Sequence, residues 1–396
     1  MKNLRLFVFF TVLIISCKKP YLPPVITAPG SFLVVEGVIN SGSDPTVIKL
    51  SKTVNLSSGT TANPLPKATV TVEDNQNNTY TLTESSPGNY VSPGLNLSSS
   101  LQYRLRIKTS DDKQYLSDFV PVLNSPPIDT ISYSAQSNGL NIYSATHGPT
   151  NSIKYYRWDY QETWQIHATY FSYFKSNGDT VLARDLVHDN IYYCWQSDTS
   201  STILLGSTAK LSKDVMVDNP ITFIASTAEK LGTKYSILVR QYALTADAYS
   251  FYQNIRKNTE QLGSIFDAQP SEIPGNIHSV TNPSEPVIGY VSVGTVSSKR
   301  IFITNQQLPN WLPANPYPYC KLDTALYKYV CPDCKGPPIN QVNQLINFKK
   351  NNSAYLIPVQ AIMPPGSSTV LGFSAAQREC VDCTIRGTNK QPAFWK

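Results

Sequence analysis

The sequence predicts an all-β protein, built mainly of tandem β-sandwich domains with one short helix. Charged residues make up 15% of the 396 residues, whereas typical globular domains carry roughly 25%. The chain contains 24 Tyr and is rich in Thr and Val, and aromatic and β-branched residues favour strands. From residue 32 onwards, short runs of alternating apolar and polar residues recur about every 8–15 residues between turn residues, which is typical of sandwiches.

A short basic start followed by an apolar run opens the chain. Lys2 and Arg5 precede Leu6–Cys17, which reads LFVFFTVLIISC. This pattern is typical of a secretory signal, and the run is too short to span a bilayer comfortably. Its last four residues, IISC, fit the bacterial lipobox, which implies a lipoprotein signal peptide over residues 1–16, cleavage before Cys17 and diacylglycerol on the Cys17 sulfur. The alternative is an ordinary signal peptide in which this Cys occurs by chance.

Residues 17–30 are rich in proline and show no periodicity. Such a segment predicts an extended tether between the lipid and the folded part. Lys18 follows the acylated Cys. Because Asp at that place would resemble an inner-membrane retention signal, Lys favours a lipid-anchored protein of the outer membrane, in contact with the bilayer through Cys17. The periplasmic and the cell-surface face both stay open, since the acidic residues that follow this Cys in many surface-displayed lipoproteins are missing.

The charge distribution excludes one class of partner. The net charge is +6, and the charges are scattered, with no basic run beyond Lys18-Lys19. This thin excess argues against a nucleic-acid-binding surface. No later stretch has 18 consecutive apolar residues, so no membrane-spanning helix is expected after the signal.

Residues 31–125 are predicted to form the first β-sandwich. Strands are expected at residues 32–39, 46–50, 68–73, 79–82, 89–91, 103–107 and 114–117. The order of ATVTVED, YTL, GNYV and YRLRI along this region resembles the immunoglobulin/transthyretin-like modules of exported bacterial proteins, which are mostly spacers or binding platforms. No catalytic role is therefore assigned to it. Pro126-Pro127 breaks the alternation and predicts the domain boundary.

A second β-rich domain is predicted over residues 126–312, and its densest segment is aromatic. Along residues 155–166 the alternation places one set of side chains on one face of a strand, namely Tyr156, Trp158, Tyr160, Glu162 and Trp164. An aromatic stripe with a period of two usually lies in a sheet core. The alternative is a platform for stacking sugars or peptides, with Tyr156, Trp158, Tyr160 and Trp164 as ligand-contact candidates. The polar residues 175–190 predict an exposed loop, the second candidate for a contact surface.

One helix is expected in the second domain, over residues 246–262. Thr245 is placed to cap its start, and Gly263 stands where a helix end favours left-handed backbone. The helix is expected to pack on the second sandwich. Its predicted packing face consists of Tyr249, Tyr252, Ile255 and Thr259. Further strands are expected at residues 192–195, 202–205, 221–224, 234–242, 287–293 and 299–303.

Residues 313–396 form a predicted Cys-rich C-terminal segment with few apolar residues. Besides Cys17, the chain contains Cys194, Cys320, Cys331, Cys334, Cys380 and Cys383. An even number of cysteines in an exported protein favours disulfides, and six cysteines allow fifteen pairings. The alternative is structural zinc, held by the two CxxC pairs Cys331/Cys334 and Cys380/Cys383. A redox-active CxxC is a third possibility, although no thioredoxin-like pattern surrounds either pair.

No catalytic motif is found, so an enzyme is not predicted. The four histidines, His147, His167, His188 and His278, lack the spacing of metal ligands, and no nucleophile elbow or phosphate-binding loop occurs. Asp159 and Glu162 fall on opposite faces of one strand, which makes them a poor acid/base pair for glycoside chemistry. An exported enzyme with an unrecognised site remains an alternative.

Several segments together resemble a known family. They are YYRWDYQETWQI, CW, YSILVRQYALTADAY, LGSIFDAQP, VIGYVSV, KRIFI and ECVDCTIRGTNKQPAFW. With the lipobox and the amino-terminal sandwich, they resemble the Bacteroidota outer-membrane lipoproteins that share the domain of unknown function numbered 4249. The resemblance covers nearly the whole mature chain. It implies an outer-membrane lipoprotein, often encoded near a TonB-dependent receptor, and it carries over no active-site residue.

These observations predict a non-catalytic accessory or ligand-capture subunit of a TonB-dependent nutrient transporter. Such a subunit needs a tether, a rigid scaffold and side chains that bind without reacting. The alternative is a surface adhesion or structural lipoprotein, in which the tandem sandwiches act as a stalk.

Overall fold

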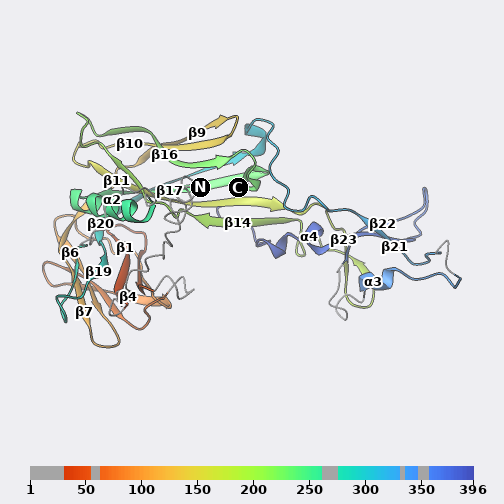
Figure 1. Cartoon of the computed structure of the whole chain (residues 1–396), viewed down its shortest axis with the longest axis horizontal. Coiled ribbons are helices and arrows are strands. Elements are labelled where there is room, and N and C mark those ends of the chain that lie inside the picture. The colour runs from red at the N-terminus through yellow and green to blue at the C-terminus, as the bar shows by residue number, and fades with distance from the viewer. Residues whose placement is uncertain (1–30, 55–62, 261–274, 331–334, 347–355) are drawn as a thin grey trace, which may run out of the picture.

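The computed structural model describes residues 31–54, 63–260, 275–330, 335–346 and 356–396, and it is built mainly of strands. The predicted all-β class is confirmed, with two sandwich-like bodies at one end of the molecule and a smaller module at the other (Figure 1). The predicted signal peptide, tether and Cys17 lie outside the described residues. Within those ranges, no helix is long and apolar enough to cross a membrane.

The first body contains the strands predicted for residues 31–125. Its sheet order is β1-β2-β5-β4-β3-β6-β7. The bounds are β1 (Leu33–Asn40), β2 (Thr46–Lys52), β3 (Thr69–Asp74), β4 (Thr79–Ser86), β5 (Asn89–Ser92), β6 (Gln102–Lys108), β7 (Gln114–Ser117) and β8 (Val120–Asn124). Alternate residues point inwards, and the core includes the fully buried Ile48, Tyr90, Leu105 and Ile107.

The first body also takes in a segment that the predicted domain ranges assign to the second domain. Strand β18 (Ile277–Ser279) pairs with β7, and β19 (Val287–Gly289) pairs in parallel with β1. Ile277 of β18 and Val287 of β19 complete the same apolar core, together with Val291 and Val293, which follow β19 in the chain. The first domain is therefore discontinuous in sequence, and a single boundary at Pro126-Pro127 does not describe it.

The second body is a sandwich of two sheets. One sheet has the order β14-β11-β17-β20, with β15 beside β11, and the other has the order β16-β10-β9. The bounds are β9 (Ile128–Gln136), β10 (Gly139–His147), β11 (Tyr155–His167), β14 (Tyr193–Thr199), β15 (Leu204–Ser207), β16 (Val215–Ala225), β17 (Lys234–Leu244) and β20 (Ser292–Thr304). Ile142, Tyr156, Ile224 and Val239 meet between the sheets.

Strand β20 belongs to both bodies. Its first residues pair in parallel with β1 (Val38↔Ser292), and its later residues pair antiparallel with β17 (Tyr235↔Ile303). The two bodies are thus joined by a continuous hydrogen-bonded strand rather than by a loose linker.

Helix α2 (Ala246–Glu260) begins where the sequence predicts, because the Thr245 Oγ1 accepts a hydrogen bond from the Ala248 N–H at 3.1 Å. Its packing face is the predicted one only in part, since Tyr249 and Tyr252 lie against Tyr155 and Arg157 of β11. Ala248 and Phe251 are the buried residues, whereas Thr259 is exposed. The helix contacts β11, β15 and β17, as expected for the second sandwich. Gly263, the predicted C-terminal cap, lies outside the described residues.

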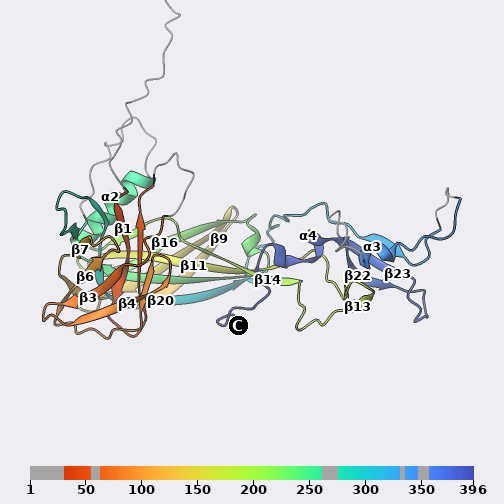
Figure 2. The ribbon, with the colours of Figure 1, turned by 90° about the horizontal axis from the view of Figure 1, so that it is seen from below.

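The Cys-rich segment forms a small module that projects from the second body (Figures 1 and 2). Its elements are β21 (Asp323–Leu326), α3 (Val342–Ile346), β22 (Leu356–Ile362), β23 (Gly372–Gln377), α4 (Arg378–Val381) and the 3-10 turn η5 (Cys383–Ile385). A hairpin of the second domain, β12 (Phe174–Ser176) and β13 (Val181–Ala183), packs on it. Residues 175–190 are thus not wholly an exposed loop, although residues 185–188 are exposed.

One disulfide fixes this module to the body, and a second lies within the Cys-rich segment itself. Cys194 on β14 is bonded to Cys383, and Cys320 is bonded to Cys380. Because Cys380 and Cys383 both lie in disulfides with other residues, they supply neither thiolates to zinc nor a redox-active pair with each other. This corrects the four-thiolate zinc site, and it corrects the redox alternative for this CxxC pair. Cys331 and Cys334 lie outside the described residues.

The disulfide pattern is directly testable. Peptide mapping without reduction is expected to recover one cross-linked peptide with Cys194 and Cys383 and another with Cys320 and Cys380. Replacing Cys194 and Cys383 together by Ala is expected to lower the free energy of unfolding by about 2–5 kcal/mol, because the unfolded chain regains the freedom of a long loop. A peptide linking Cys380 to Cys383, or thiols released by a chelator together with zinc, would contradict these pairings.

A buried carboxylate in the first body predicts acid sensitivity. Glu73 accepts hydrogen bonds from the Nε of Arg104 (2.8 Å) and of Arg106. Burial raises the pKa of Glu73, but the two arginines outweigh it and hold the pKa below the usual range. Its stabilising contribution is therefore present above the pKa of the unfolded chain and is lost as the pH falls through the folded-state pKa. Glu73→Gln is expected to cost about 1–3 kcal/mol at pH 7.

Denaturant titrations measure the free energy of unfolding. The difference in this free energy between Glu73→Gln and the wild type should shrink as the pH falls from 7 towards 3. Glu36→Gln, which alters an exposed carboxylate on β1, is the matched control and should change stability little. If Glu73→Gln lowered the free energy of unfolding equally at pH 7 and near pH 3, the charge of Glu73 would not contribute to stability.

Candidate functional site

A cleft lies between the two bodies. It consists of two adjoining spaces of about 580 and 540 Å³. Strands β1 and β2 of the first domain form one wall, and β11, β17, β20 and α2 form the other. The spaces share the side chains of Glu36, Lys49, Arg157, Asp159 and Arg240, as well as Gly37.

The register of the second-domain sheet explains why polar residues face this cleft. Tyr156 and Trp158 point into the sandwich core, so Arg157 and Asp159, which alternate with them on β11, point outwards. Arg157 lies opposite Tyr242, and Asp159 lies opposite Arg240 on β17. Cross-strand neighbours in a sheet are close enough to interact, and these four residues form one polar cluster.

Asp159 is fully engaged within this cluster. The Nε of Arg240 donates to Oδ1 at 2.6 Å, and the Tyr242 hydroxyl donates to Oδ2 at 2.8 Å. Burial, together with the neighbouring carboxylate of Asp159, raises the pKa of Tyr242, so the phenol remains a hydrogen-bond donor. Both carboxylate oxygens of Asp159 are therefore occupied.

Arg157 is held by aromatic rings instead of by a carboxylate. Its guanidinium carbon lies 4.4 Å from the centroid of Tyr242 and 4.8 Å from that of Tyr252 on α2. Such cation–π contacts hold an arginine side chain in a defined position. The Nε of Arg157 is buried, and no hydrogen-bond acceptor for it is found in the described part of the chain.

An apolar wall adjoins this arginine. Phe251 and Ile255 of α2 line the same space, together with Tyr290, and the rings of Phe251 and Tyr290 lie 5.5 Å apart. The first-domain rim carries Glu36 and Lys49, which are cross-strand neighbours on β1 and β2. The cleft thus combines a charged cluster, an aromatic wall and a mixed-charge rim.

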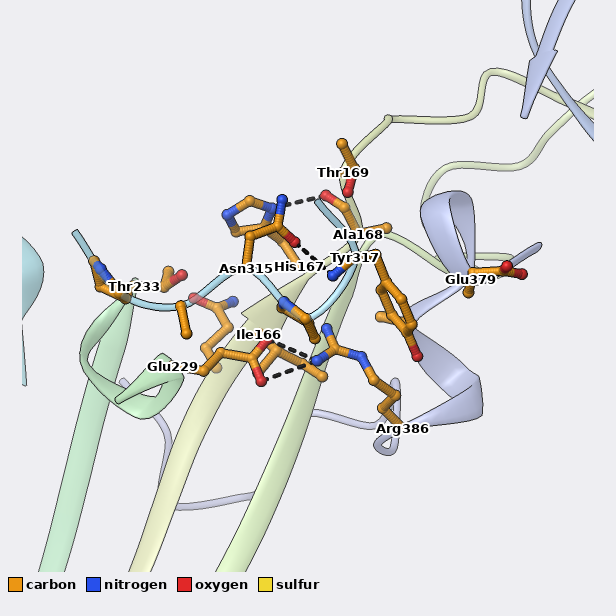
Figure 3. A pocket seen from close by; sticks show the side chains of 16 residues that line it. Ile166, His167, Ala168, Thr169, Glu229, Thr233, Asn315, Tyr317, Glu379 and Arg386 are labelled. Carbon is orange, nitrogen blue, oxygen red and sulfur yellow. Dashed lines mark hydrogen bonds and ion pairs between the residues drawn. The ribbon is translucent and has the colours of Figure 1, made fainter. Parts of the chain in front are cut away.

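A smaller space of about 300 Å³ lies where the Cys-rich module meets the body (Figure 3). Its main polar side chains are already paired with each other. The Nη1 of Arg386 donates to both oxygens of Glu229, at 2.7 and 2.9 Å, and its guanidinium lies 5.2 Å from the ring of Tyr317. Since Cys383 also lines this space, we interpret it as a structural joint reinforced by the Cys194–Cys383 disulfide.

The predicted ligand-contact residues do not line an accessible platform. Tyr156 is 0% exposed and donates to Asp214 at 2.7 Å, and Trp158 is 1% exposed and donates to Gln241 at 3.0 Å. Both belong to the sandwich core, which corrects their assignment as contacts. Tyr160 and Trp164 are half-buried and pack against the same core.

The predicted separation of Asp159 from Glu162 is confirmed. Glu162 is 4% exposed and is bonded to the Lys230 ammonium (2.6 Å) and the Tyr235 hydroxyl (2.5 Å), away from the cleft. This arrangement gives Glu162 a structural partner for each oxygen.

The histidines are dispersed. His147, His188 and His278 each lie beside an aspartate at the surface, and His167 lines the joint (Figure 3). Among the described residues, no three His, Cys, Asp or Glu side chains are grouped as metal ligands.

The residues that sequence reasoning missed are those of the opposite face of β11 and their neighbours. Alternation along residues 155–166 does place Arg157 and Asp159 together on one face. Their charge is the signal that could have found them, because Arg157 and Asp159 alternate with the aromatic core residues of β11 and Arg240 interrupts the apolar run of β17. Such residues are costly in a core and therefore mark an interface or a site.

Comparison with family models matches residues 18–300 to the domain of unknown function DUF4249. The chain belongs to this family. The matched region includes both walls of the cleft and ends before the Cys-rich module. A search of curated proteins finds no match.

The burial of Trp158 generates a prediction. Trp158→Ala is expected to lower the free energy of unfolding by about 3–5 kcal/mol, because it leaves a cavity between the sheets and a lost partner for Gln241. Trp164→Ala, at a half-buried position of the same strand, should cost less. Chemical denaturation of both variants measures their free energies of unfolding. Equal stability of Trp158→Ala and the wild type would mean that Trp158 is not a core residue.

Proposed function

We propose that the protein is a non-catalytic lipoprotein of the outer membrane that captures a small molecule in the interdomain cleft for a TonB-dependent nutrient transporter. The observation that carries this proposal is the cleft itself. Its two spaces have the size of ligand sites, roughly 300–1,000 Å³, and boundaries between domains are common places for such sites.

The construction of the cleft supports capture. Strand β20 is hydrogen-bonded into both bodies, so the two walls are held at a fixed separation. Preorganised walls lose little conformational entropy when a ligand binds. The charged cluster and the aromatic wall offer polar and apolar contacts side by side.

The membrane anchor in this proposal rests on the sequence. The lipobox ending at Cys17 is the proposed acylation site. An extended, Pro-rich segment over residues 17–30 would reach roughly 40 Å at about 3.1 Å per residue. That reach allows the folded part to approach a receptor in the same membrane.

A second candidate function, surface adhesion, is favoured by the projecting Cys-rich module. Apolar side chains such as Val330, Met363 and Leu371 are 45–69% exposed there. Exposed apolar groups of this kind are typical of contact surfaces for macromolecules. In the accessory-subunit proposal, the same surface is available to the receptor.

Filling the cleft tests the proposal. Ser298 is exposed, lines the cleft and lies opposite Arg240, so the indole of Ser298→Trp should occupy the space. The matched control is Ser134→Trp, an exposed strand serine on the other sheet. Tagged, lipidated protein would be extracted from its native envelope in mild detergent, and bound proteins and small molecules would be identified by mass spectrometry.

The wild type and Ser134→Trp are expected to retain a stoichiometric TonB-dependent receptor and a small molecule, whereas Ser298→Trp should lose the small molecule at least tenfold. If no receptor is recovered, and Cys17→Ala shows the same background, the accessory-subunit proposal fails and adhesion becomes the better account. A small molecule retained equally by all variants would show that capture does not use the cleft.

A further inference from the structure

The side chain of Arg157 carries a buried N–H group that has no hydrogen-bond acceptor among the described residues. A buried hydrogen-bond donor without a partner costs about 1–3 kcal/mol, and more when it is charged. The Nε of Arg157 is such a donor among the described residues. A ligand that supplies an acceptor at this point would remove that cost on binding.

The nearest carboxylate on the same face does not fill this role. Asp159 gives one oxygen to Arg240 and the other to Tyr242. The inner cluster of Arg157, Arg240 and Asp159 therefore carries one positive charge in excess. Because arginine stays protonated throughout the physiological range, this charge is permanent.

The surroundings select the form of the anion. Arginine presents its N–H groups in a planar fork that matches a carboxylate, and the rings of Tyr242 and Tyr252 hold that fork in place. Over the whole cleft, the cations Lys49, Arg157 and Arg240 are matched by three carboxylates, Glu36, Asp44 and Asp159. A single negative charge suits the local excess, whereas a dianion such as phosphate would meet repulsion from the rim.

The aromatic wall indicates the rest of the ligand. Phe251, Ile255 and Tyr290 line the space beside Arg157 and offer apolar contact area. We infer that the cleft binds an organic monocarboxylate, with its carboxylate on Arg157 and an apolar, ring-bearing body against α2 and Tyr290. This inference rests on the proposed capture function and names the chemical class of its ligand.

Titration calorimetry with defined probes tests the inference on the folded mature chain. The probe is 4-phenylbutanoate, and its comparison compounds are the uncharged 4-phenylbutanamide and inorganic phosphate. The acid is expected to bind at about millimolar concentration or more tightly, as its small size dictates. The amide and phosphate should each bind at least tenfold more weakly.

Two variants separate charge from fold. Arg157→Met keeps a long apolar stem and should weaken 4-phenylbutanoate binding about 10–100-fold, since it removes a charge-assisted contact. Arg386→Met is the matched control, because Arg386 also lies over a tyrosine ring but outside the cleft. It should leave binding unchanged. Thermal unfolding of both variants shows whether each is folded, and Arg157→Lys, which keeps the charge without the fork, should recover part of the affinity.

The outcomes distinguish this inference from the capture proposal. No binding of 4-phenylbutanoate, equal binding of the amide, stronger binding of phosphate or undiminished binding by folded Arg157→Met would each overturn the carboxylate assignment. The capture proposal would still stand if the small molecule recovered from the envelope is lost in Ser298→Trp. If no small molecule is recovered from the envelope but the probe binds as expected, the subsite is supported while the capture function fails.

Discussion

The backbone pairing of β20 is the constraint on which the rest of the structure depends. One end of this strand is paired with β1 and β8 of the first body, and the other end is paired with β17 of the second. Gly294 makes the parallel approach of β8 possible, since a Cβ there would lie 2.0 Å from the carbonyl oxygen of Leu123. The ladder fixes the two bodies against each other, and the cleft is the space that this arrangement leaves.

Strand β11 connects the stability of the second body to its chemistry. One face places Tyr156 and Trp158 in the core, where burial and hydrogen bonds hold the sheets together. The other face presents Arg157 and Asp159 to the cleft. Successive side chains of a strand point to opposite sides. The tight packing of Tyr156 and Trp158 therefore also fixes the backbone positions of Arg157 and Asp159, and it holds the charged cluster in place.

Local patterns in the sequence predicted the individual strands and the helix. Pairing between distant segments determined how these strands assemble into sheets and domains. The alternation along residues 155–166 and the Thr245 cap are local, and both predictions hold. The return of β19 to β1 joins residues far apart in the chain, and no local pattern encodes it. The aromatic face of β11 was expected in a sheet core, which holds for Tyr156 and Trp158. The alternative placed ligand contacts on that same face, whereas Arg157 and Asp159 of the opposite face line the cleft. Spacing likewise could not choose among the cysteine pairings, and tertiary contact brings Cys194 to Cys383 and Cys320 to Cys380.

The most direct test of the account is to see what lies against Arg157 in the protein as the cell makes it. A crystal structure of the mature chain, purified from its native envelope without added ligands, would show this. We expect density for a small-molecule carboxylate within hydrogen-bond distance of the Arg157 Nε, with its apolar part beside Phe251. A carboxylate side chain of this same chain bonded to Arg157, in a cleft that it closes, would contradict the account.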